Sequence, residues 1–333
     1  MGELQFVMLG AGFWAGYQLA AWQEIPGARC IGVCAPDRVK AEALASQFGI
    51  SGMYTDPTEA IAKSGADFID IVTPPATHPE LVRLALSYKK PTICQKPLAE
   101  TLADAEALVA EAQAAEVPLL VHENWRWQAP LRALKAELDS GVIGEVFRAR
   151  LTMVSGFPLF INQPGLKKLE RFLLADIGVH VLDTARFLFG EADQVYCHLR
   201  RVQPDIAGED AATILTQHSH MSVITELGYV QNFYERDRFP QTFAFIEGAQ
   251  GSIDLATDYW LRTTTKDGTY ARRVSPPRYR WANPEYDVVH ASMVPCLTNL
   301  LAGIRGEPCE TTAADNLKTL QLIEGAYQNG IWL

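Results

Sequence analysis

The fold is decided near the start of the chain, by Leu4-Gln5-Phe6-Val7-Met8-Leu9-Gly10-Ala11-Gly12-Phe13-Trp14-Ala15. Its opening residues form a short apolar run of the kind found in buried parallel strands. The pattern G-x-G-x-x-A follows, and a helical stretch begins within it. Gly10 permits a tight turn, Gly12 lets backbone N–H groups approach a pyrophosphate, and Ala15 is small enough for close packing of helix on strand. We therefore predict a strand–turn–helix unit that binds a dinucleotide.

The alternation of strand and helix continues after this unit. Further strands are predicted over residues 29–34, 67–73, 91–94 and 118–121, and helices over 38–48, 57–63, 78–88 and 101–115. Such alternation implies a doubly wound parallel sheet, and we assign residues 1–123 to a Rossmann domain. Ligands of these sheets bind at the carboxyl ends of the strands. Those ends hold Gly10 to Gly12, Ala35 to Arg38, Thr73 to His78, Gln95 to Pro97 and His122 to Asn124.

The end of the second strand leaves the choice of cofactor open. An NAD enzyme usually places an acid there to bind the adenosine 2′-hydroxyl. Here that place is taken by Ala35, and Asp37 and Arg38 follow. Asp37 could bind the ribose diol, and Arg38 could equally bind the 2′-phosphate of NADP.

A second informative stretch is Ala175-Asp176-Ile177-Gly178-Val179-His180-Val181-Leu182-Asp183. As a helix it places Asp176, His180 and Asp183 on one face. A histidine beside a carboxylate is a natural acid–base unit, because the carboxylate favours the protonated ring and fixes its orientation. Alternatively, Asp176 caps the helix and His180 is a satisfied core histidine. Gly178 is costly in a helix interior, which suggests a close approach to the backbone there.

Composition sets the broad class of the protein. A chain of 333 residues is longer than most single hydrophobic cores, so two domains are expected. Hydrophobic residues at 48% and a net charge of −10 are typical of an ordinary globular protein and argue against a nucleic-acid binder. No apolar run approaches the length of a membrane span, and residues 1–5 lack the basic region of a signal peptide. We therefore expect no membrane partner and a cytoplasmic location.

No metal site is expected. The six cysteines are scattered without a CxxC pair, which indicates buried thiols rather than a disulfide framework or a zinc site. His218 and His220 share a strand face, but no third ligand lies near them in the sequence.

After Asn124 the strand–helix alternation stops. Helices are predicted over 130–140, 285–304 and 311–325, and strands over 145–154, 194–202, 211–217, 222–229, 242–247, 252–255 and 260–264. This pattern predicts that residues 124–333 form an α+β domain with a large open, mostly antiparallel sheet, carrying the Asp176 helix on one face. Because the other face of such a sheet needs a cover, we expect a homo-oligomer, dimer or tetramer, assembled through this sheet.

Aromatic residues follow the domain boundary. Trp125 and Trp127 flank Arg126 at the rim of the strand ends, an arrangement that suits a sugar. Packing between domains is an equal alternative for these rings. The loop at Asn162 and Gln163 supplies two further amides that could bind substrate.

Four motifs occur in an order that resembles the glucose–fructose oxidoreductase/inositol dehydrogenase/MocA (Gfo/Idh/MocA) family. They are the glycine pattern, Thr73-Pro74-Pro75-x-x-His78, Gln95-Lys96-Pro97 and Asp176-x-Gly178-x-His180-x-x-Asp183. The resemblance covers nearly the whole chain, including the helix start at residues 311–318. The stretches 12–15, 122–127 and 237–240 are also similar to the bacterial D-apiose dehydrogenases within this family.

The resemblance implies roles for individual residues. Lys96 corresponds to a catalytic lysine, His180 to a general base, and Asp176 to an acid that orients substrate. Thr73, Pro74 and His78 would line the cofactor cleft, and a cis bond is expected before Pro97. The family usually has Glu-Lys-Pro where this chain has Gln95-Lys96-Pro97, so the role of that glutamate is open here.

The resemblance also implies an NAD(P)-dependent oxidoreductase acting on CH–OH groups. The expected reaction is hydride transfer from an aldose or polyol to nicotinamide, with D-apiose oxidised to its lactone; an inositol or another aldose with NADP is the alternative. A non-catalytic dinucleotide sensor and an NAD-dependent glycosidase are the competing classes.

NAD is the expected cofactor, with NADP possible. The predicted cofactor-binding residues are Gly10, Gly12, Phe13, Trp14, Asp37, Arg38, Thr73, Pro74, His78, Gln95, Lys96 and Asn124; the predicted substrate residues are Trp127, Asn162, Gln163, Asp176 and His180.

Overall fold

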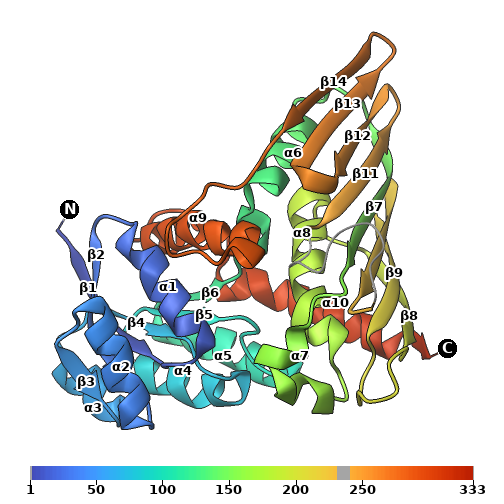
Figure 1. The fold of residues 1–333 in the computed structure, drawn as a ribbon. Coiled ribbons are helices and arrows are strands. Elements are labelled where there is room, and N and C mark those ends of the chain that lie inside the picture. The colour runs from blue at the N-terminus through green and yellow to red at the C-terminus, as the bar shows by residue number, and fades with distance from the viewer. Residues whose placement is uncertain (1, 231–240, 333) are drawn as a thin grey trace. The chain divides into compact units, whose positions relative to one another are not determined.

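The chain forms two compact units in a computed structural model that describes residues 2–230 and 241–332 (Figure 1). The first unit comprises residues 1–124, 279–282 and 293–318. The second comprises residues 125–278, 283–292 and 319–333. Two short segments from late in the chain therefore pack with the amino-terminal unit.

The first unit is built on a parallel sheet of six strands. Its strands are β1 (Leu4–Leu9), β2 (Ala28–Cys34), β3 (Gly52–Tyr54), β4 (Phe68–Ile71), β5 (Thr92–Gln95) and β6 (Leu119–His122). They lie in the order β3-β2-β1-β4-β5-β6, and every pair is parallel. This is the doubly wound order of dinucleotide-binding domains, as predicted. Only β3 was not predicted from the sequence.

Helices connect these strands, and capping residues mark where they begin. They are α1 (Phe13–Gln23), α2 (Arg38–Phe48), α3 (Pro57–Lys63), α4 (His78–Ser87) and α5 (Leu102–Ala115), with a 3₁₀ turn, η1 (Pro75–Thr77), before α4. The side chains of Asp37, Asp56 and Thr101 accept backbone N–H bonds at the starts of α2, α3 and α5. Gly49 ends α2 in a left-handed conformation.

The second unit contains a nine-stranded sheet in the order β14-β13-β12-β11-β7-β10-β9-β8-β15. Its strands are β7 (Val146–Val154), β8 (Gln194–Arg200), β9 (Ala211–His218), β10 (Met221–Gly228), β11 (Phe243–Gly248), β12 (Gly251–Ala256), β13 (Trp260–Thr265), β14 (Gly268–Arg273) and β15 (Gly330–Trp332). The pairs β7–β10 and β8–β15 are parallel, and the others are antiparallel. The mostly antiparallel sheet is therefore confirmed. Strands β14 and β15 were not predicted.

Helices pack on one side of this sheet (Figure 1). The helical elements between residues 125 and 189 are the 3₁₀ turn η2 (Trp125–Trp127), α6 (Ala129–Asp139), α7 (Leu159–Asn162), η3 (Pro164–Lys168), a π-helical segment η4 (Leu174–Gly178) and α8 (Val179–Phe189). Helix α8 contacts β7 and β10, and α6 contacts β12. Residues alternate between buried and exposed along β8 and β9, as expected for a sheet covered on one face. The exposed large apolar residues on the strands include Phe147, Tyr196, Leu215, Phe245 and Trp260.

Two long helices follow the sheet in the sequence, α9 (Asp287–Ile304) and α10 (Ala313–Gln328). Among the described residues, one helical stretch, Pro284–Ile304, is long and apolar enough to cross a membrane by length and composition. No apolar run of this length was predicted from the sequence. Since 56% of its most apolar window is buried inside the structure, the stretch resembles a core helix and is weak support for a span.

Candidate functional site

The turn after β1 has the geometry that a dinucleotide-binding loop requires. Gly10 has a φ of +123°, and a Cβ there would lie 2.0 Å from the carbonyl oxygen of Val72. Any side chain at this position is therefore excluded. Gly12 is the N-cap of α1, and a Cβ built on it meets no atom within 4 Å. An open helix N-terminus of this kind suits a phosphate group, because its N–H groups and its dipole both favour an anion.

Aromatic rings lie beside this helix start. The ring centroid of Phe13 is 5.2 Å from that of Trp14 and 5.4 Å from that of Tyr17, in edge-to-face arrangements. Phe13 is 43% exposed. Both predicted aromatic residues are therefore held at the glycine turn.

The end of β2 gives Asp37 and Arg38 local partners. Asp37 Oδ1 accepts bonds from the backbone N–H groups of Val39 and Lys40, at 3.1 and 3.3 Å. Arg38 Nε donates to Glu42 Oε1 at 2.9 Å, and both of these side chains are largely exposed. Asp37 thus caps α2 with one oxygen, and its Oδ2 atom lies 3.7 Å from Lys40 Nζ.

His78 joins the loop after β4 to the loop after β5. Its Nε2 atom lies 2.9 Å from the carbonyl oxygen of Thr73, and its Nδ1 atom lies 2.8 Å from that of Pro97. Burial lowers the pKa of His78, and the bonds to the two carbonyls oppose that shift. The Lys96–Pro97 bond is cis, as expected. The predicted residues Thr73, Pro74 and Lys96 are therefore on two loops joined by one ring.

Gln95 is bonded to its neighbours through both polar atoms of its amide. Its Oε1 accepts from the backbone N–H of Lys96 at 3.2 Å, and its Nε2 lies 2.7 Å from Gln18 Oε1 and 2.9 Å from His122 Nδ1. Gln18 in turn donates to both carboxylate oxygens of Asp70, at 2.8 and 2.9 Å. The amide of Gln95, a predicted cofactor residue, is therefore bonded to partners within the protein.

Asp70 is a fully buried acid in the middle of β4. It accepts a further bond from Trp22 Nε1 at 2.8 Å. Burial raises its pKa to about 7, and the bonds from Trp22 and Gln18 moderate that rise.

In the second unit, Asp176 and His180 lie on consecutive helical segments rather than on one α-helix. Asp176 belongs to the π-helical segment, and His180 belongs to the first turn of α8. The single α-helix predicted from Asp176 to Asp183 therefore begins within a π turn, which contains an extra residue; such segments are frequent at functional sites. Gly178 closes this segment, and a Cβ there would lie 3.3 Å from Leu227 of β10. The expected close approach to Gly178 is confirmed.

Asp176 and His180 each have an aromatic neighbour. Tyr229 Oη donates to Asp176 Oδ2 at 3.4 Å, and burial beside this carboxylate raises the pKa of Tyr229 well above its usual value. The ring of Trp125 stacks on that of His180, with centroids 4.7 Å apart and planes inclined by 21°. Trp125 is buried and donates through Nε1 to Thr242 at 2.9 Å. Its ring therefore supports His180.

Trp127, the predicted substrate aromatic, has a cation as its neighbour. The guanidinium of Arg132 lies over its ring, 4.4 Å from the centroid, and over that of Phe187 at 4.8 Å.

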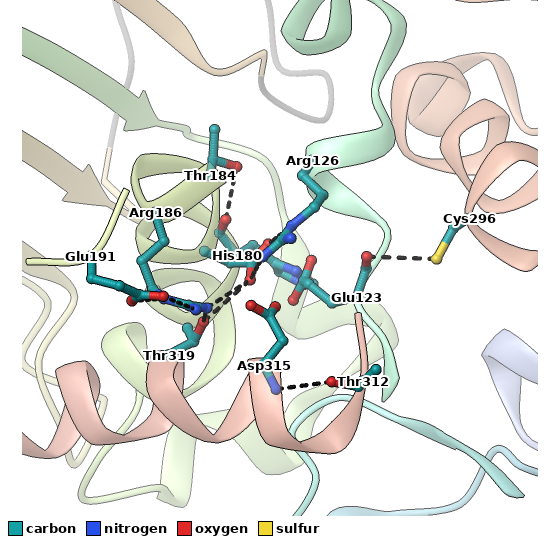
Figure 2. A network of polar contacts seen from close by, with 11 residues as sticks. Glu123, Arg126, His180, Thr184, Arg186, Glu191, Cys296, Thr312, Asp315 and Thr319 are labelled. Atoms are coloured by element: carbon teal, nitrogen blue, oxygen red, sulfur yellow. Dashed lines mark hydrogen bonds and ion pairs between the residues drawn. The ribbon is translucent and has the colours of Figure 1, made fainter. Parts of the chain in front are cut away.

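A buried ionic network surrounds the middle of α8 (Figure 2). Arg126 binds Asp183 through two nitrogens, at 2.7 and 2.5 Å. Thr319 links Asp183 to Arg186, and Arg186 also binds Glu191. Asp183 therefore fixes α8 against η2, the turn that carries Trp125.

Glu209 holds the start of the π-helical segment. Its carboxylate accepts from the backbone N–H groups of Phe172 and Leu174, at 3.3 and 3.0 Å, and from Tyr327 Oη at 2.6 Å. Glu209 is fully buried between β8 and β9. The position of Asp176 thus depends on a residue distant in the sequence.

Fewer contacts are described for the remaining predicted residues. Asn124 is buried and follows β6, and Gln163 lies between α7 and η3. The side chain of Asn162, like the whole stretch 237–240, lies outside the described residues. His218 bonds to Thr216 and Gly190 within the protein. No group of potential metal ligands occurs in the described part of the chain.

Several residues of these networks were not found from the sequence. Asp70 had a detectable signal, because an acid inside an apolar parallel strand must find buried partners. Gln18, Glu209, Tyr229 and Tyr327 had none, because their partners come from other elements far away in the chain.

Comparison with known proteins extends this picture. Residues 4–123 match the oxidoreductase family with an NAD-binding Rossmann fold, and residues 131–254 match the GFO/IDH/MocA C-terminal domain. A D-apiose dehydrogenase from Rhizobium rhizogenes is 39% identical over 99% of this chain and 96% of its own length. Another from Paraburkholderia graminis is 40% identical over 96% of this chain and 86% of its own length.

A solved structure is similar over the same extent. An oxidoreductase from Agrobacterium radiobacter, in complex with NAD⁺, L-tartaric acid and magnesium, superimposes with a TM-score of 0.95. It is 39% identical, over 98% of this chain and 96% of that one. The glycine turn, the loops joined by His78, the two sheets and the extent of these matches lead to one conclusion: the chain belongs to the Gfo/Idh/MocA family of oxidoreductases, whose amino-terminal domain binds NAD.

Proposed function

We propose that this protein is an NAD-dependent sugar dehydrogenase that oxidises D-apiose to its lactone. One observation carries the proposal. Lys96, Asp176 and His180 are all present in a chain that is 39–40% identical, over nearly its whole length, to two D-apiose dehydrogenases. The geometry supports it, because the backbone of Lys96 and the ring of His180 are each held by contacts within the protein.

The chain's own residues supply the proton chemistry. His180 removes the proton of the sugar hydroxyl, which requires its neutral form, and Trp125 fixes the plane of the imidazole. Lys96 stabilises the negative charge that develops on the oxygen. Asp176, bonded to Tyr229, orients another substrate hydroxyl. When bound, the nicotinamide accepts the hydride from the oxidised carbon.

The first unit fits the cofactor. Gly12 leaves room for the pyrophosphate at the start of α1, and Phe13 and Trp14 flank it. The side chain of Asp37 is about half exposed, with Oδ2 beside Lys40. Arg38 is engaged by Glu42, which favours NAD over a cofactor with a 2′-phosphate. Residues 1–123 would bind the cofactor and residues 124–333 the sugar, with Trp127, Asn162 and Gln163 as candidate sugar contacts.

We also propose a cytoplasmic homo-oligomer. The exposed face of the nine-stranded sheet carries Phe147, Tyr196, Leu215, Phe245 and Trp260 among charged residues. Burial of this face against a second copy would remove that apolar surface from water.

Turnover with purified protein tests the function. We expect reduction of NAD⁺, followed by absorbance, with D-apiose in a panel that also contains other aldoses, myo-inositol and L-tartrate. Lys96→Ala and His180→Ala should each lower kcat by about two orders of magnitude or more, because each removes acid–base or electrostatic assistance. NAD⁺ affinity should largely survive. Lys63→Ala and His220→Ala, both at exposed positions, serve as controls. Near-normal turnover in either site variant would exclude that residue from the mechanism.

Cofactor choice provides a second test. Asn caps a helix as well as Asp does, so Asp37→Asn keeps the start of α2 and removes only the charge. We expect wild-type kcat/KM to favour NAD⁺ over NADP⁺, and the variant to narrow that preference by about tenfold, or about 1.4 kcal/mol. A wild-type preference of tenfold or more for NADP⁺ would show that Arg38 governs the pocket instead.

A further inference from the structure

The backbone on both sides of Lys96 is held by side chains. On the amino side, the N–H of Lys96 donates to Gln95 Oε1 at 3.2 Å, where the ladder of β5 with β6 ends. On the carboxyl side, the carbonyl of Pro97 lies 2.8 Å from His78 Nδ1. Any catalytic role of Lys96 therefore depends on these two contacts for its position.

The contact on the amino side continues into the interior as a chain of amides. Gln95 Nε2 donates to Gln18 Oε1, and Gln18 Nε2 donates to Asp70. Gln18 and Asp70 are fully buried, and Trp22 occupies another lone pair of Asp70. Each bond has one donor and one acceptor, so the orientation of every amide follows from its neighbours.

The direction of this chain is set by its two ends. Lys96 can only donate from its backbone N–H. Above its pKa of about 7, Asp70 is a carboxylate and can only accept. The two glutamines between them must therefore both point their oxygens toward Lys96 and their nitrogens toward Asp70. A carboxylate at position 95 would have no N–H to donate to Gln18. In the present orientation of Gln18, two oxygen acceptors would then face each other between residues 95 and 18. If Gln18 flipped, its oxygen would instead face the carboxylate of Asp70. The hydrogen-bond chain from Lys96 to Asp70 therefore accommodates one carboxylate, not two.

We propose that Gln95 is a positioning residue for Lys96, acting as a pair with Asp70 through Gln18. Position 95 requires a neutral amide because the carboxylate of this hydrogen-bond chain is supplied by Asp70. The catalytic part of the inference rests on the proposed function, in which Lys96 contacts the substrate. The pairing also explains why the amide of Gln95 is engaged by Gln18 and His122.

Reversing the donor–acceptor direction of the hydrogen bonds between residues 95, 18 and 70 provides the test. Gln95→Glu and Asp70→Asn each introduce a mismatch. In the double variant, the new asparagine at position 70 can donate to a flipped Gln18. That amide then donates to the new glutamate at position 95, whose carboxylate still accepts from Lys96. Assays are run above the pKa of Asp70, where its carboxylate is ionised. There we expect each single variant to lower kcat about tenfold or more and the double variant to return within about threefold of the wild type. Gln113→Glu, at an exposed position of α5, is the matched control.

Hydrogen exchange of the Lys96 amide is the second readout and needs no substrate. We expect exchange to accelerate at least about tenfold in both single variants and to slow again in the double variant. Single-variant effects that simply multiply in the double variant, in kcat or in exchange, would overturn the proposal. So would a Gln95→Glu variant with normal kcat, or one impaired only in KM for NAD⁺, which would assign Gln95 to the cofactor.

A wild-type protein that turns over no sugar would contradict the proposed function alone. The exchange rates of the Lys96 amide alone would then test the pairing of residues 70 and 95.

Discussion

Asp70 in the first unit and Asp183 in the second are both fully buried carboxylates, but their charges are compensated in different ways. Asp183 binds Arg126 through two nitrogens, and Arg186 lies 3.7 Å away. Asp70 accepts its bonds from neutral donors, Gln18 and Trp22. A guanidinium offsets the desolvation of a buried anion by direct Coulomb attraction, whereas neutral dipoles offset less of it. Asp70 accordingly has a pKa raised to about 7.

The two units therefore hold their predicted catalytic residues, Lys96 and His180, in different ways. In the second unit, full charges join α8 to η2, and this connection brings Trp125 onto the ring of His180. In the first unit, oriented amides transmit the position of a buried acid to the backbone of Lys96. Removal of one charge should therefore damage the second unit more than the first.

The largest effect is expected from Asp183→Asn. This change removes the buried carboxylate that Arg126 binds through two nitrogens, which should lower the free energy of unfolding by about 3–5 kcal/mol. Urea denaturation of the variant measures this. Asp258→Asn in the same unit is the control, because the pair of Asp258 with Arg273 is about half exposed and should contribute less than about 1 kcal/mol. Equal losses in both variants would mean that the buried ion pairs of Asp183 contribute no more to stability than an exposed ion pair.

The next effect concerns pH and Asp70. The folded protein retains the Asp70 proton up to a pKa of about 7, whereas the ordinary value of an aspartate is 3.8. Between these values the folded state binds more protons than the unfolded state, so this group makes stability fall as pH rises, by at most about 1.4 kcal/mol per pH unit. The thiols of Cys30 and Cys94 near Asp70 have raised pKa values and stay neutral in this window.

Asp70→Asn should remove this dependence. Urea denaturation of wild type and variant from pH 5 to pH 8 would show a difference in unfolding free energy that changes with pH. Parallel curves for the two proteins would contradict a titrating Asp70 and weaken the comparison with Asp183.

The smallest effect is expected at Trp125. Trp125→Phe keeps a ring against His180 and loses only the bond to Thr242, so stability should fall by about 0.5–1.5 kcal/mol with little change in kcat. Trp125→Leu removes the flat surface that orients the imidazole, and kcat should fall about tenfold. Thr242→Val controls for the lost hydrogen bond. Equal turnover in the Leu and Phe variants would mean that stacking does not position His180.

The amino-terminal fold could be predicted from the sequence because its signals are local. The apolar run at Leu4–Leu9, the glycine turn and the alternation of strands and helices act within a few residues, and they specified the parallel sheet. The resemblance carried by four ordered motifs specified the family, and the family matches confirm it. Short strands such as β3 and β15 gave too little periodicity to detect.

The contacts that hold the predicted site residues come from tertiary packing and could not be predicted from local sequence. The helical pattern from Ala175 to Asp183 did not reveal a π segment, because its cause is the fixation of the segment's start by Glu209 and close packing at Gly178. Likewise, Gln95 and His180 have partners on a helix and a turn far away in the chain, Gln18 on α1 and Trp125 on η2. Local sequence specifies which elements form, whereas partners brought together by packing determine the orientation of a buried side chain.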